Sequence, residues 1–225
     1  MPISLEAIIE NEINFVADTA KRKIKVLDLG AGSAPYWHAK SMSSSLVDKV
    51  LELTLLDASS EFSNEVISQK TILKRITGLV PKDLQNFGEN EFDLVVAFDL
   101  IEHLPKHEGY ALLYHLDRIA RFSSVVLTPT GFAWQPPAIN NAYNAHISGW
   151  RTSELKALGW KARNKGQIGF KLFYGPYGFQ KYKGSNWLIL EFIALSKILS
   201  YPFPKLSFSQ IAIKRSKNPW VKTQK

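Results

Sequence analysis

Short apolar runs rich in β-branched residues alternate with helix-length segments through the first 130 residues of the chain. This alternation is typical of a parallel sheet whose strands are joined by crossover helices. The sequence therefore predicts an α/β fold. Strands are expected at residues 24–30, 50–59, 70–78, 92–100 and 123–131, and amphipathic helices at the amino terminus and over 107–122.

The pattern changes after Gly131. Residues 132–150 are rich in proline, asparagine and aromatic side chains, and a long irregular segment inside a compact domain is usually a functional loop. The following residues predict a short helix that is capped by Thr152 or Ser153 and closed by Gly159. Alternating β-branched residues over 207–215 predict a final strand.

A late apolar segment, residues 187–200, has helical spacing and few charges. It belongs to a stretch, 170–206, that we interpret as an insertion before the last strand. Two interpretations stay open for this insertion. It is either a lid or core-packed helix, or a helix that rests on a membrane surface with help from lysines 171, 181, 183, 197 and 205.

Composition narrows the class of protein. With 225 residues and 45% hydrophobic content, we expect one domain over 1–225. The chain has no cysteine, which excludes disulfides, thiolate zinc sites and a cysteine nucleophile. The net charge of +8 suggests an anionic partner without identifying it. The amino terminus lacks the pattern of a secretory signal, so we expect a cytoplasmic protein, with peripheral membrane contact as the second option.

The sequence KVLDLGAGSAPYW, residues 25–37, predicts a strand followed by a glycine-rich turn into a helix. Gly30 and Gly32 would let the backbone turn tightly and approach a ligand. Pro35 stands where a dinucleotide site would have a third glycine. Asp28 would repel a phosphate but could accept hydrogen bonds from a cationic amine. The loop therefore favours a ligand with a positively charged head.

Three ordered motifs resemble class I S-adenosylmethionine-dependent methyltransferases. D-x-G-x-G at 28–32 resembles the first motif of this family, Asp57 closes the second predicted strand, and FDLVVAFDLIEHLPK at 92–106 is similar to the fourth-strand motif of its small-molecule members. The resemblance covers roughly residues 20–130. It implies a Rossmann-like, seven-stranded, mostly parallel sheet with helices on both faces, plus the helical insertion before the last strand. The implied cofactor is S-adenosylmethionine.

The resemblance also implies which residues bind the cofactor. The glycine loop would hold the methionine end, and Asp57 would bind the ribose hydroxyls. Many family members have an acid after the third strand that meets the adenine amino group. This chain has Thr77, Gly78 and Leu79 there, so adenine is expected to contact backbone groups and Leu79. The expected cofactor-binding residues are Asp28, Gly30, Ala31, Gly32, Asp57, Ala58, Gly78, Leu79, Asp99 and Leu100.

Two residues are candidates for the chemistry. Asp99 ends the fourth predicted strand and would contact the methionine portion or the acceptor, or else cap a helix that begins near Ile101. His146 lies in the segment 132–150, which would cover the acceptor side in this architecture. It could take a proton from a hydroxyl, or could fasten the loop to Ser148 or backbone.

No metal site is predicted. His103 and His107 have helical spacing, but Pro105 interrupts the helix and no third ligand follows at a recognisable spacing. His103 is expected to pack over the cofactor edge or to bond locally. Trp134 and Trp150 could line the acceptor site or simply pack.

The predicted function is methyl transfer from S-adenosylmethionine to a small-molecule or lipid-linked acceptor. A non-catalytic protein that binds this cofactor and an NAD(P)-dependent oxidoreductase remain as alternatives. A nucleic-acid acceptor is disfavoured because no N-P-P-Y-like or S-P-P-Y-like sequence follows the fourth strand. The partner is therefore expected to be a small or amphiphilic acceptor, with residues 187–200 as the candidate membrane contact. The oligomeric state is left open.

Overall fold

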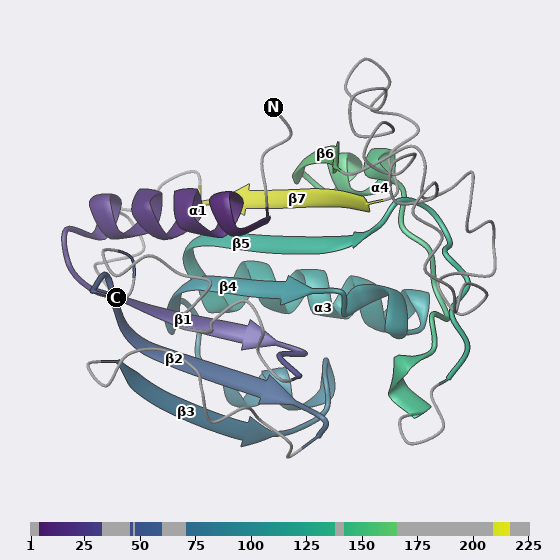
Figure 1. Cartoon of the computed structure of the whole chain (residues 1–225), viewed down its shortest axis with the longest axis horizontal. Helices are drawn as coiled ribbons and strands as arrows, with labels where there is room; N and C mark the ends of the chain where they lie inside the picture. Colours follow the sequence, from purple (N-terminus) through teal and green to yellow (C-terminus); the bar gives the residue numbers. More distant parts are fainter. Residues whose placement is uncertain are drawn as a thin grey trace, which may run out of the picture. The chain divides into compact units, whose positions relative to one another are not determined.

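The computed structural model describes residues 5–32, 46, 48–59, 71–137, 142–165 and 209–216 (Figure 1). The strands follow the order β3-β2-β1-β4-β5-β7-β6 in one seven-stranded sheet. Strand β1 runs parallel to β2 and β4, and β2 runs parallel to β3, whereas β6 and β7 are antiparallel. The helices and strands are α1 (Leu5–Ala20), β1 (Ile24–Leu29), β2 (Val50–Asp57), β3 (Ile72–Thr77), η2 (Lys82–Asn86), β4 (Phe92–Phe98), η3 (Ile101–His103), α3 (Lys106–Ile119), β5 (Ala120–Pro129), η4 (Ala142–Asn144), α4 (Thr152–Ala157), β6 (Lys161–Lys165) and β7 (Ser209–Arg215).

The predicted α/β class, the mostly parallel seven-stranded sheet and the six strands that the sequence indicated are confirmed. Strand β5 begins at Ala120, three residues earlier than expected, because α3 ends at Ile119 and passes directly into it. Strand β6 was not predicted. It has the sequence KARNK and lies at the end of the sheet beside β7, where charged side chains on a solvent-facing edge are common.

The chain forms two compact units, which are described separately. The larger one comprises residues 3–98, 110–125 and 214–225. Its central strands β1, β2 and β4 are almost continuously buried, as expected for parallel strands covered on both faces. Leu27 pairs in register with Thr54 and Val95, and all three are at most 1% exposed. This packing fixes where the carboxyl ends of the three strands lie.

Helices cover both faces of the sheet in the larger unit. The Ser123 hydroxyl of β5 donates to Glu12 of α1 at 2.8 Å, and the next hydroxyl, Ser124, donates to the carbonyl of Leu116 on α3 at 3.0 Å. Successive strand residues point to opposite faces, so α1 and α3 lie on opposite sides of β5. The expected arrangement with helices on both faces is therefore confirmed by the described residues.

The smaller unit comprises residues 99–109 and 126–213, together with Met1 and Pro2. Its short helix α4 does not begin as predicted: Arg151 is the N-cap, and neither Thr152 nor Ser153 fills that position. The reason is that the Glu154 carboxylate turns back and accepts the Arg151 backbone N–H at 2.8 Å. Gly159 has φ of +84° and closes the helix end as expected.

The insertion predicted for 170–206, including the helix over 187–200, lies outside the described residues. Among the helices that the structure describes, none is both long enough and apolar enough to span a bilayer.

Candidate functional site

The loop that follows β1 turns at two glycines with left-handed backbone. Gly30 has φ of +69° and Gly32 has φ of +51°. The backbone N–H groups of Gly30 and Ala31 donate to the Leu56 carbonyl of β2 at 2.8 and 3.3 Å. A Cβ atom added at Gly32 would meet nothing within 4 Å, so the backbone conformation alone favours glycine there.

Asp57, at the end of β2, joins the loops that follow three strands. Its Oδ2 accepts the Gly32 N–H at 2.9 Å, and its Oδ1 accepts the Ser59 N–H at 2.8 Å. The Gly78 N–H, directly after β3, donates to the Asp57 carbonyl at 2.9 Å. The half-buried carboxylate therefore organises the glycine loop, and each oxygen keeps a second lone pair for a ligand.

A further acid, Asp83, lies where the sequence lacked one. It belongs to η2, and its Oδ2 accepts the Leu79 N–H at 2.7 Å. A Cβ atom added at Gly78 would lie 3.0 Å from that same Oδ2 atom. The expectation that only backbone and Leu79 face this position is therefore incomplete. No sequence motif points to Asp83, because a turn of helix brings it back to the end of β3.

The other predicted cofactor residues are divided between the two units. Asp28 is 2% exposed within β1, and Ala58 and Leu79 are exposed in the larger unit. Asp99 and Leu100 directly follow β4 and belong to the smaller unit.

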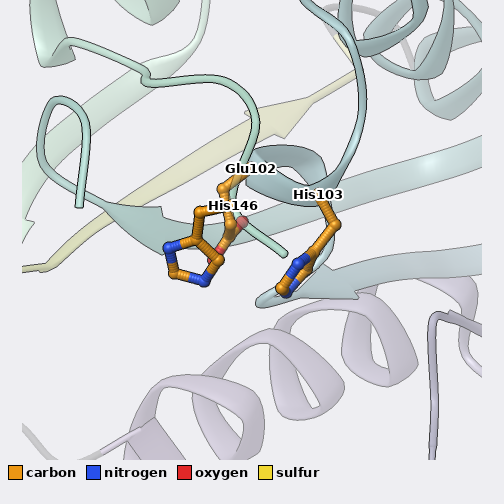
Figure 2. Close-up of side chains that lie close together, drawn as sticks. All are labelled: Glu102, His103 and His146. Atoms are coloured by element: carbon orange, nitrogen blue, oxygen red, sulfur yellow. The ribbon is translucent and has the colours of Figure 1, made fainter. Parts of the chain in front are cut away.

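In the smaller unit, three ionisable side chains gather although the sequence separates them. Figure 2 shows the Glu102 carboxylate beside the imidazoles of His103 and His146. One potential ligand atom from each residue lies within 4.8 Å of the others, and the ring centroids of the two histidines are 4.7 Å apart. The Glu102 carbonyl accepts the N–H groups of Ile147 and Ser148 at 2.9 and 3.0 Å, and these bonds hold the segment that carries His146 against η3.

The same atom of both imidazoles is bonded to backbone. Nδ1 of His103 lies 3.0 Å from the Ala145 carbonyl, and Nδ1 of His146 lies 2.6 Å from the Ala133 carbonyl. A carbonyl only accepts, so each Nδ1 carries the proton and each Nε2 keeps a lone pair in the neutral ring.

The two histidines favour the neutral ring. Burial lowers the pKa of His103, against the opposing carbonyls of Ala145 and Asp99. Burial also lowers the pKa of His146, as does the neighbouring His103. Both imidazoles can therefore act as bases or ligands at neutral pH.

Glu102 is 2% exposed, which is unusual for a carboxyl group. Its Oε2 accepts the Thr128 hydroxyl at 2.9 Å, whereas its Oε1 has no hydrogen-bond partner among the described residues. Burial and the nearby Asp99 raise the pKa of Glu102 to about 8. The carboxyl group is thus held in an environment that disfavours its charged form unless a cation is present.

Asp99 adopts the left-handed region, with φ of +47°, immediately after β4. Its N–H donates to the Leu127 carbonyl at 3.0 Å, and its side chain is exposed. The interpretation of Asp99 as a helix cap is wrong, because Leu100 occupies the N-cap of η3 and no side chain caps it. A strained non-glycine residue at a strand end is typical of functional sites.

The structure changes two further interpretations. His146 does not bond to Ser148, whose hydroxyl instead donates to the Ile101 carbonyl at 3.2 Å. Trp150 is fully buried and cannot line an acceptor site, whereas Trp134 is 41% exposed. His103 meets His146 and not His107, which is exposed.

Comparison with known proteins gives a fold. No protein-family model matches the chain. No curated protein matches it in sequence. Among solved structures, the chain is similar to a SAM-dependent methyltransferase from Archaeoglobus fulgidus, with a TM-score of 0.51 and 14% identity over 94% of each chain. It also matches magnesium protoporphyrin IX methyltransferase from Synechocystis PCC 6803, with a TM-score of 0.45 and 14% identity over 94% of this chain and 79% of that one. The methyltransferase domain of bacterial CtHen1 gives a TM-score of 0.47 and 15% identity over 95% and 100%. The first of these likenesses assigns the architecture: the chain has the fold of the Archaeoglobus fulgidus methyltransferase.

Proposed function

We propose that the protein is a methyltransferase that uses S-adenosylmethionine and acts on a small-molecule or lipid-linked acceptor. The observation that carries the proposal is Asp57, an acid at the end of β2 around which the loops after β1, β2 and β3 are hydrogen bonded. In open parallel sheets, ligands bind at the carboxyl ends of the strands.

The described atoms suit the parts of this cofactor. The lone pairs that remain on Asp57 match the vicinal hydroxyls of a ribose. Asp83 offers its Oδ1, which has no partner among the described residues, to the amino group of adenine. Asp28 is a negatively charged group at the end of β1, as a ligand with a cationic amino-acid head requires.

The transfer itself asks little covalent chemistry of the protein. The acceptor's lone pair forms a bond to the methyl carbon, and the carbon–sulfur bond breaks with its electrons returning to sulfur. The products are methylated acceptor and S-adenosylhomocysteine, and a proton leaves the acceptor. The Nε2 atoms of His103 and His146 are candidates to take that proton, because their lowered pKa values leave them neutral.

Exposed apolar side chains bear on the acceptor. Four of them lie within 15 residues of His146 along the chain, on the segment that follows β5. Such a group of exposed large side chains in one segment is typical of a surface that binds an aromatic or amphiphilic molecule. They are Phe132, Trp134, Tyr143 and Ile147.

Replacement of Asp57 by alanine should weaken S-adenosylmethionine binding about tenfold to a hundredfold, which corresponds to the loss of about 1–3 kcal/mol of hydrogen bonding. Calorimetric titration measures the affinity, and circular dichroism shows whether the variant is folded. Asp117→Ala is the matched control, since this exposed carboxylate on α3 pairs with Lys214 at 3.1 Å. Tight NAD(P) binding by a protein that does not bind S-adenosylmethionine would contradict the proposal, and cofactor binding without methyl incorporation into any acceptor would favour a non-catalytic role.

Replacement of Asp83 by alanine should weaken binding of S-adenosylhomocysteine by about 0.5–1.5 kcal/mol, the typical value of one hydrogen bond. The analogue with hypoxanthine in place of adenine lacks the amino donor, so its affinity should not change. Comparison of the two ligands by calorimetry on both proteins checks this. An equal loss for both ligands would mean that Asp83 only shapes the loop through Leu79.

A further inference from the structure

We infer that Glu102, His103 and His146 form a binding site for a divalent transition-metal cation of the Mn²⁺ or Zn²⁺ kind. Two imidazoles and one carboxylate are a donor set that such cations prefer. The inference about binding stands on the smaller unit alone, and the role given to the metal below rests on the proposed function.

The three donors are arranged for a shared ligand. Their potential ligand atoms lie within 4.8 Å of one another, whereas ligands around a tetrahedral cation lie roughly 3.3 Å apart, given metal–nitrogen distances near 2.1 Å. Adjustment of the side chains by about an ångström would therefore close the site. Glu102 and His103 are adjacent on η3, and the two bonds from Ile147 and Ser148 to the Glu102 carbonyl hold His146 beside them.

The groups around the histidines match those of metal ligands. A metal-bound histidine almost always donates its other ring N–H to a carbonyl or carboxylate, which fixes the tautomer and the ring orientation. Both His103 and His146 do so through Nδ1, to Ala145 and Ala133. The atom left for coordination is Nε2 in each ring.

Glu102 supplies a second, independent observation. Its buried Oε1 atom has no partner among the described residues, and a buried oxygen of this kind is costly unless something binds it. Its Oε2 is oriented by the Thr128 hydroxyl at 2.9 Å. Asp99, which acts electrostatically on both Glu102 and His146, adds negative charge next to the site. A divalent cation would satisfy the oxygen and compensate this charge.

Three protein ligands leave coordination positions open. In the proposed reaction, an acceptor hydroxyl could occupy one of them, and coordination would lower its pKa and favour loss of its proton to solvent or base. The acceptor class that follows is a molecule with a hydroxyl group, or two neighbouring ones, next to an apolar portion.

The test is titration of the chelator-treated full chain with MnCl₂, followed by electron paramagnetic resonance, and with ZnCl₂, followed by calorimetry. One saturable site per chain is expected. His146→Ala and Glu102→Gln should each weaken it by at least about a hundredfold, since even the loss of an outer hydrogen bond costs tenfold to a hundredfold. His107→Ala is the matched control and should bind as the unaltered chain does, because His107 is exposed and lies outside the cluster.

Two readouts keep the inference separable from folding and from the proposed function. Thr128→Val preserves side-chain shape, and it should weaken metal binding about tenfold through the lost bond to Glu102. Absence of saturable binding in the unaltered chain, or equal affinity in all variants, would overturn the site. S-adenosylmethionine affinity is measured on the same samples: metal binding without cofactor binding contradicts only the proposed function, and the reverse contradicts only the metal site.

Discussion

Replacement of Glu102 by glutamine will flatten the pH dependence of stability of the metal-free protein between about pH 4.5 and 8. Burial and Asp99 raise the pKa of this carboxyl group in the folded state, so the folded protein binds a proton that the unfolded chain releases. Stability is therefore greatest below the unfolded pKa and is lost as pH rises through the folded one. A shift from 4.5 to about 8 corresponds to about 5 kcal/mol.

Urea unfolding at pH 5 and pH 8 with a chelator present measures the effect. The unaltered protein should lose several kcal/mol over this interval, and Glu102→Gln should lose much less. His103 and His146 have lowered pKa values, and their contribution has the opposite sign: stability rises with pH as the unfolded histidines deprotonate. These two residues are present in both proteins, so the comparison isolates Glu102. Glu89→Gln, at an exposed carboxylate, should retain the full slope; retention of that slope by Glu102→Gln would assign it to another group.

The sheet could be predicted from the sequence because its signals are local. Strands β1, β2 and β4 are apolar runs of six to eight residues, and burial on both faces requires such runs. Gly30 and Gly32 mark a turn with positive φ, which few other residues adopt. Strand β6 has no such signal. It is charged, it pairs only with β7, and the bonds to that partner determine its conformation.

The site could be predicted only in part, because half of it depends on contacts between distant residues. Asp57 is visible as an acid that ends an apolar strand, but its bond to Gly32 spans 25 positions. His146 reaches Glu102 through backbone bonds that close a loop of more than 40 residues, and no spacing rule encodes them. The available signal for Glu102 is an acid between apolar residues in DLIEHL, directly after a buried strand.

Replacement of Trp150 by alanine should lower the free energy of unfolding by about 3–5 kcal/mol, the range for loss of a large core aromatic side chain. Trp150 is fully buried, and its indole N–H donates to the Ser148 hydroxyl at 3.1 Å and to the Ile101 carbonyl at 3.3 Å. The Lys106 ammonium lies 3.5 Å from its ring centroid. Urea unfolding measures the loss. Trp134→Ala is the matched control, with an expected change within about 1 kcal/mol because that side chain is 41% exposed.

Gly109 gives a sharper test of the same packing. A Cβ atom added there would lie 2.3 Å from Cζ2 of Trp150, so Gly109→Ala alone should destabilise the protein by about 1–3 kcal/mol through overpacking. In the Trp150→Ala background that contact is gone. Alanine is the better helix former by about 1 kcal/mol, so the same substitution in α3 should then be neutral or stabilising. This change of sign in a double-mutant cycle would identify the indole as the neighbour that requires glycine. Equal losses in both backgrounds would place the steric conflict elsewhere, and the 3.3 Å approach to Ile101 is the next candidate.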